Sequence, residues 1–104
     1  MNDPLVFLNG EVLPISQAKV SVLDRGFIFG DGVYEVVPVY GGRLFRFDEH
    51  MARLERSLKE CRIRNPHDRA GWAAMARELI SRYAAAHGVP ASDCDQLIYL
   101  QITR

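Results

Sequence analysis

The chain has 104 residues, of which 48% are hydrophobic, so it is long enough for one small domain with a single modest core. Its 13 basic and 13 acidic residues balance, and the arginines are scattered, which excludes nucleic acid or an anionic membrane as the main partner. Residues 1–4 lack the basic start of a signal peptide, and the next apolar run is interrupted at Asn9. We therefore expect neither a signal peptide nor a membrane span.

The first two expected strands form a hairpin. Residues 5–8 are apolar, Asn9-Gly10 suits a type I′ turn because both residues tolerate positive φ, and a second short strand runs to Leu13. Three glycines between residues 26 and 32 then interrupt regular structure and predict a tight loop, which we expect Phe27 and Phe29 to anchor.

A second hairpin is expected from residues 33–40 and 43–47, joined through Gly41-Gly42. Pro38 has no backbone N–H to donate to a neighbouring strand, so it predicts an edge strand or a bulge. A last strand is expected over residues 97–102.

Two helices are expected between the second hairpin and the last strand. The first begins with Asp48 as N-cap and runs to about Cys61, with one apolar face made of Met51, Leu54, Leu58 and Cys61. Asp68 caps the second, which ends near Gly88 and by its periodicity buries Trp72, Met75, Leu79 and Tyr83. Strands, two helices and a strand define an α+β domain covering residues 1–104.

The glycine segment 24–32 has two interpretations. Closely spaced glycines let backbone N–H groups approach a phosphate, but a dinucleotide-binding motif has a helix directly after the glycines, and here a β-rich run follows. The residues alone therefore favour a structural connection. Cys61 and Cys94 form no C-x-x-C pair and the histidines are dispersed, so neither a metal site nor a disulfide is indicated, and a reducing cytoplasm is favoured. No serine lies in a G-x-S-x-G motif, so a serine nucleophile is not indicated either.

Arg53 and Tyr34 each have a functional and a structural interpretation. At helical spacing His50, Arg53 and Ser57 lie along the border of the apolar face, where an arginine either extends into a cleft to bind phosphate or is simply solvated. Alternation places Tyr34 and Val36 on one face of their strand, where they either orient a carboxylate substrate or pack in the core.

Residues 22–63 resemble the start of class IV, fold-type IV pyridoxal-phosphate enzymes, and most of all D-amino-acid aminotransferases. Two motifs carry the resemblance: the stretch from Asp24 to Val36, and His50-Met51-Ala52-Arg53-Leu54 with Ser57. The resemblance implies that the chain is the N-terminal small domain, with antiparallel hairpins and two packed helices. It also implies that the large lysine-bearing domain lies beyond Arg104.

The resemblance implies roles for individual residues. Arg53 matches the arginine that binds the phosphate of pyridoxal 5′-phosphate, and Tyr34 and Val36 match residues that line the substrate pocket. Neither Lys19 nor Lys59 lies in the motif of the family's Schiff-base lysine, so no catalytic residue is expected here and the chain alone should be inactive.

The resemblance further implies a homodimer acting on small amino and 2-oxo acids. The expected reaction moves an amino group from a D-amino acid such as D-alanine to 2-oxoglutarate. A branched-chain aminotransferase and an aminodeoxychorismate lyase share the small-domain fold and the phosphate arginine, and a non-catalytic dimerisation or folding module is the alternative of another class.

Overall fold

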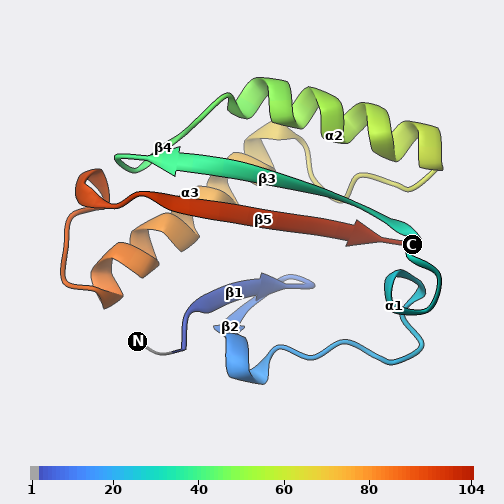
Figure 1. The fold of residues 1–104 in the computed structure, drawn as a ribbon, viewed down its shortest axis with the longest axis horizontal. Coiled ribbons are helices and arrows are strands. Elements are labelled where there is room, and N and C mark those ends of the chain that lie inside the picture. The colour runs from blue at the N-terminus through green and yellow to red at the C-terminus, as the bar shows by residue number, and fades with distance from the viewer. Residues whose placement is uncertain (1–2) are drawn as a thin grey trace.

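The computed structural model describes residues 3–104 and confirms an α+β fold with antiparallel sheets (Figure 1). Two strands form one sheet and three form another, and two long helices follow the second hairpin. The strands and long helices are β1 (Leu5–Leu8), β2 (Glu11–Pro14), β3 (Gly32–Tyr40), β4 (Arg43–Leu44), α2 (Phe47–Cys61), α3 (Arg69–Ala86) and β5 (Gln96–Thr103). No helix within residues 3–104 is both long and apolar enough to cross a membrane.

The β1–β2 hairpin forms as predicted. Asn9 and Gly10 both have positive φ, at 49° and 92°, as a type I′ turn requires. The hairpin packs against α3, where the ring of Phe7 lies edge-on to His67 and His67 edge-on to Trp72. These aromatic contacts attach the two-stranded sheet to the rest of the fold.

The glycine segment differs from the expected irregular loop, because it contains a short helix, α1 (Arg25–Phe29). The Asp24 carboxylate accepts a hydrogen bond from the Gly26 N–H, which caps the helix start, and Gly30 ends the helix with φ of 63°. The expected anchoring by Phe27 and Phe29 is wrong, since these side chains are 72% and 66% exposed. Contacts with the end of β5 hold α1 instead.

The three-stranded sheet has the order β4-β3-β5, so β3 is its middle strand and the prediction of an edge strand at Pro38 is wrong. β3 pairs with β5 continuously from Gly32 to Val39, without the alternative bulge. The Phe45 N–H donates to the Pro38 carbonyl, so Pro38 faces the β4 side of the sheet. β4 ends at Leu44, so the N–H that Pro38 lacks would point past the end of β4, and the proline is tolerated there. The predicted strand over residues 43–47 is therefore only two residues long.

Helix α2 begins two residues earlier than predicted, because its N-cap is residue 46 and not residue 48. Arg46, in the left-handed conformation, is its N-cap and makes no side-chain cap, so the N-cap role expected for Asp48 is wrong. Asp48 instead lies in the first turn, where the helix dipole favours a negative charge. Met51, Leu54 and Leu58 are buried as predicted, whereas Cys61 is exposed.

Helix α3 has the predicted cap but a different buried face. Asp68 accepts a hydrogen bond from the Gly71 N–H at 2.7 Å, and Gly88 has positive φ just past the helix end. The predicted face is wrong: Trp72, Met75 and Leu79 are only half-buried and Tyr83 is exposed, whereas the residues buried are Ala73, Ala76, Ile80 and Ala84. The small alanine side chains let α3 pack closely against its neighbours, and the larger side chains lie at the borders of this buried face.

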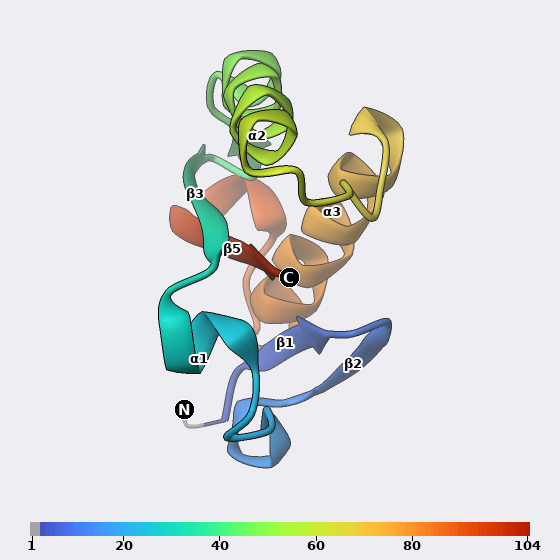
Figure 2. The same ribbon diagram turned by 90° about the vertical axis from the view of Figure 1, so that its right-hand side faces the viewer.

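Both long helices lie on the same side of the three-stranded sheet (Figure 2). The main core joins Val37 and Ile102 of the sheet to Met51, Leu54 and Leu58 of α2. The opposite face of the sheet stays open along the described chain, and Tyr34, Leu97 and Tyr99 are each at least 60% exposed there.

Candidate functional site

The most unusual polar group is Glu35, which is 3% exposed and is the only buried charged residue in the described chain 3–104. Glu35 lies on the inner face of β3, at a position flanked by Val33 and Val37, and α2 packs over it. A buried carboxylate is stable only when cations or hydrogen-bond donors satisfy it. Helix α2 supplies both.

Two side chains of α2 satisfy Glu35. Arg53 donates through Nε to Oε2 and through Nη2 to Oε1, both at 2.8 Å, which forms a bidentate ion pair. His50 Nδ1 lies 2.9 Å from Oε1, and an ionised carboxylate only accepts, which assigns a proton to Nδ1. Residues 50 and 53 lie almost one turn apart, so both reach the same carboxylate.

The ion pair shifts the pKa of both partners. The hydrogen bonds from Arg53 lower the pKa of Glu35 below its usual value, with a further contribution from His50, although burial acts in the opposite direction. The hydrogen bond to Glu35 raises the pKa of Arg53, and Tyr34 adds a smaller electrostatic contribution. Glu35 is therefore ionised and Arg53 charged throughout the neutral range.

Arg53 keeps free donors that fit a phosphate group. Its side chain is 59% exposed even though Glu35 is buried beneath it. A guanidinium has five N–H donors, and the pair with Glu35 uses two, so the remaining three point away from the carboxylate. A rigid arginine with unused donors at the surface is the arrangement that binds phosphate oxygens.

Tyr34 and Val36 lie on the opposite face of β3 from Glu35. Tyr34 is 63% exposed and stacks on Tyr99 of β5 with ring centroids 5.7 Å apart, and Val36 is paired with Tyr99 in register. The structure thus brings Tyr34 and Val36 together but places Arg53 on the α2 side. Because β4 pairs only with residues 39 and 40, the β4-side edge of β3 near Tyr34 has no strand partner.

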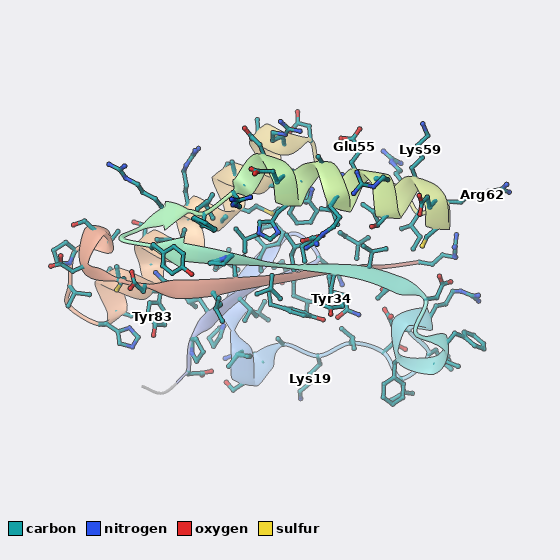
Figure 3. All side chains as sticks on the ribbon, turned by 45° about the horizontal axis from the view of Figure 1, so that its top comes forward. Lys19, Tyr34, Glu55, Lys59, Arg62 and Tyr83 are labelled. Atoms are coloured by element: carbon teal, nitrogen blue, oxygen red, sulfur yellow. The ribbon has the colours of Figure 1, made fainter. Side chains whose placement is uncertain are left out.

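The two lysines lie away from these residues. Figure 3 shows Lys59 on the outer side of α2 and Lys19 in the loop on the other side of the sheet, and neither points toward Tyr34. Ser57, expected beside Arg53, is half-buried one turn further along α2. Residues 3–104 contain no group of three metal-ligating side chains.

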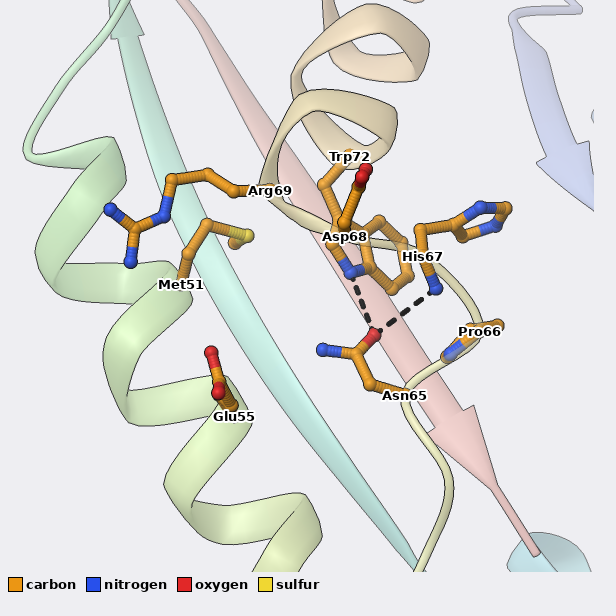
Figure 4. Close-up of a pocket in the computed structure, with 8 residues that line it drawn as sticks. All are labelled: Met51, Glu55, Asn65, Pro66, His67, Asp68, Arg69 and Trp72. Atoms are coloured by element: carbon orange, nitrogen blue, oxygen red, sulfur yellow. Dashed lines mark hydrogen bonds between the residues drawn. The ribbon is translucent and has the colours of Figure 1, made fainter.

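A separate hollow of about 450 Å³ lies between α2 and the start of α3 (Figure 4). Its polar groups stabilise the fold: the Asn65 amide oxygen accepts a hydrogen bond from Trp72 Nε1 at 2.9 Å, and Asp68 caps α3. Arg69 lies 3.5 Å from Asp48. This hollow contains none of the residues expected to bind cofactor or substrate.

Sequence reasoning did not identify the role of Glu35, although a signal was present. Alternation in β3 places Glu35 with Val33, Val37 and Val39 on the inner face, where a charge is costly unless it is paired. The following helix carries basic residues at the border of its apolar face, the side on which it packs against the sheet. That combination points to the Glu35–Arg53 pair.

Comparisons with known proteins place these features in a family. The family model for amino-transferase class IV matches residues 32–104, which include Glu35, Arg53 and both long helices. The chain belongs to this family, which confirms the resemblance seen in the sequence.

Relatives and solved structures agree with this assignment. A D-alanine aminotransferase from Staphylococcus aureus is 39% identical over 99 residues, which are 95% of this chain and 32% of that protein. A hypothetical aminotransferase from Mycobacterium tuberculosis, solved in a PLP-bound form, matches with TM-score 0.80 and 26% identity over 99% of this chain and 34% of its own. A T.th. branched-chain amino acid aminotransferase, complexed with N-(5'-phosphopyridoxyl)-L-glutamate, matches with TM-score 0.72 and 25% identity, over 99% and 33% of the two chains. The chain thus spans about a third of the length of these proteins.

Proposed function

We propose that residues 1–104 are the small domain of a pyridoxal-phosphate-dependent aminotransferase that moves an amino group from a D-amino acid such as D-alanine to 2-oxoglutarate. In this proposal a larger domain supplies the cofactor-bearing lysine, and two copies form a cytoplasmic homodimer. The free thiols of Cys61 and Cys94 support a reducing compartment.

The observation that carries the proposal is the exposed Arg53 guanidinium held by buried Glu35. Its three unused donors match a phosphate, and a relative at 39% identity is a D-alanine aminotransferase. The PLP-bound form of the Mycobacterium tuberculosis aminotransferase supports the same cofactor.

Each site residue has a distinct task in the proposed enzyme. Arg53 binds the cofactor phosphate, and Glu35 with His50 fixes the plane of the guanidinium, so little entropy is lost when phosphate binds. Tyr34 and Val36 form one wall of the substrate pocket at the open edge of β3, where the tyrosine hydroxyl orients the carboxylate of the substrate. When bound, pyridoxal phosphate supplies an electron sink for the substrate α-carbon.

A branched-chain aminotransferase is the second candidate, because the T.th. enzyme of that kind matches over 99% of this chain. By the resemblance, both candidates use Arg53 for the cofactor phosphate, so the substrate separates them. Assaying the intact enzyme with D-alanine and with L-leucine, each with 2-oxoglutarate, separates them, and activity with neither favours the lyase or the non-catalytic module.

Arg53→Ala in the intact enzyme tests the cofactor role. Loss of a charge-assisted fork should weaken pyridoxal phosphate binding by about ten- to a hundredfold, measured by titrating the apoenzyme with cofactor. Arg53→Lys should recover only part of the affinity, because an ammonium keeps the charge but loses the planar fork.

Arg56→Ala is the matched control for this test. Arg56 lies on the same helix, is exposed, and makes no ion pair among residues 3–104, so its removal should leave the dissociation constant unchanged. An Arg53→Ala enzyme that binds cofactor as tightly as the Arg56→Ala control contradicts the phosphate assignment.

A further inference from the structure

Arg104 joins three elements at the end of β5. Its Nε donates to the Asp31 carboxylate at 2.7 Å, immediately before β3 begins. Its Nη2 and Nη1 donate to the carbonyls of Cys61 and Arg62, at 2.7 and 3.1 Å, where α2 ends. The Arg104 N–H also donates to the Asp31 carbonyl, so backbone and side chain together fix this residue.

These bonds determine how α2 lies along β3. The last carbonyls of a helix have no partners within it and carry the negative end of its dipole, so a guanidinium satisfies both needs. The ion pair with Arg104 lowers the pKa of Asp31, with a smaller contribution from Arg25, and keeps the carboxylate charged at neutral pH. One side chain thus connects the end of α2 to the start of β3.

The same two elements carry the phosphate site. Arg53 lies on α2 and Glu35 lies on β3, and their two hydrogen bonds of 2.8 Å tolerate little sliding of one element along the other. Arg53 lies eight residues before Cys61, which is about 12 Å along a helix of 1.5 Å rise per residue. A helix transmits an axial shift of its end over that distance.

We infer that Arg104 is a positioning residue for the phosphate site: by binding the end of α2 and Asp31 together, it holds Arg53 in register with Glu35. This inference rests on the proposed function, in which Arg53 binds the cofactor phosphate. Arg104 itself lies at the C-terminal end of α2, and its hydrogen bonds go to neither Arg53 nor Glu35.

A purely structural role for Arg104 is the competing explanation, and the chain offers two controls against it. Arg25 also pairs with Asp31, at 3.2 Å, but lies on α1 and makes no hydrogen bond to α2. Ile80 is buried on α3 and contributes to stability, and it takes no part in the hydrogen bonds of Arg104. Arg25→Met therefore tests loss of an Asp31 partner, and Ile80→Val tests general destabilisation.

The first measurement follows the Arg53 Nε–H in the 104-residue chain by ¹H–¹⁵N NMR, with Arg53→Lys assigning the signal. In Arg104→Met, solvent exchange of this proton should accelerate by about threefold or more, because its bond to Glu35 is weakened. Arg104→Lys should give an intermediate rate, since one ammonium cannot reproduce the guanidinium fork, and it serves alone if the methionine variant does not fold. Both controls should leave the rate unchanged.

The second measurement titrates the intact enzyme with pyridoxal phosphate. Arg104→Met should weaken cofactor binding by about two- to thirtyfold, the range reported for mutations that modulate coupling between sites. If wild-type enzyme binds no pyridoxal phosphate, the proposed function fails, whereas the NMR result still decides whether Arg104 sets the register. Exchange of the Arg53 Nε–H that stays at the wild-type rate in Arg104→Met, or rises equally in Ile80→Val, overturns the inference.

Discussion

Glu35→Gln removes the negative charge beneath Arg53 while keeping the size of the side chain. An NH₂ group, which donates and cannot accept, replaces one carboxylate oxygen, so at least one donor of Arg53 or His50 loses its partner. Breaking a fully buried ion pair costs about 3–5 kcal/mol. Because the Arg53 side chain is 59% exposed and water can solvate it, we expect a smaller loss of about 1–3 kcal/mol in the free energy of unfolding.

Urea denaturation at pH 7 measures this loss, with Glu55→Gln as control. Glu55 is exposed on α2 and unpaired among residues 3–104, so its replacement should change stability by less than about 0.5 kcal/mol. Folding lowers the pKa of Glu35, so its contribution is complete above the unfolded value near 4.5 and is lost as the pH falls through the folded value. The wild type and Glu35→Gln should therefore converge at low pH. Parallel stability curves from pH 7 to pH 3 would refute the reasoning.

Two further predictions concern the isolated chain. The open sheet face and α1 expose large apolar side chains, among them Phe27, Phe29 and Tyr34, so we expect dimers or larger species, and a strictly monomeric signal in light scattering at high concentration contradicts this. The isolated chain should show no spectral signature of a covalently bound cofactor and no transamination of D-alanine with 2-oxoglutarate, because Lys19 and Lys59 lie away from the site; measurable turnover would contradict the assignment of the lysine to another domain.

Local sequence patterns predicted the elements whose signals are local. Asn9-Gly10 sets the first hairpin, Asp68 caps α3, and Gly88 ends it, because each depends on the backbone preference of one or two residues. The buried face of α3 was not predictable in this way. Large side chains dominated the periodicity, yet burial depends on how closely a helix approaches its neighbours, and alanines such as Ala76 allow the closest approach.

The candidate site was partly visible in the sequence. Arg53 and Tyr34 were identified through the family motif, and alternation correctly placed Tyr34 and Glu35 on opposite faces of β3. The pairing of Arg53 with Glu35 and the three contacts of Arg104 were not visible, because they join residues 18 to 73 positions apart. Such contacts depend on the packing of α2 on the sheet, which no local pattern encodes.

Gly26→Ala distinguishes the two interpretations of the glycine segment. Gly26 lies in α1 without positive φ, so its backbone accepts alanine, but a Cβ there would collide with the methyl group of Thr103 on β5. If close packing is the reason for this glycine, Gly26→Ala should lower the melting temperature, and the double variant with Thr103→Ser should recover most of the loss. Serine removes the methyl group and keeps the hydroxyl that donates to Asp24. If the glycine is instead required so that the backbone can approach a phosphate, Thr103→Ser should give no such rescue. Effects of the two substitutions on stability that simply add in this double-mutant cycle would refute the packing explanation.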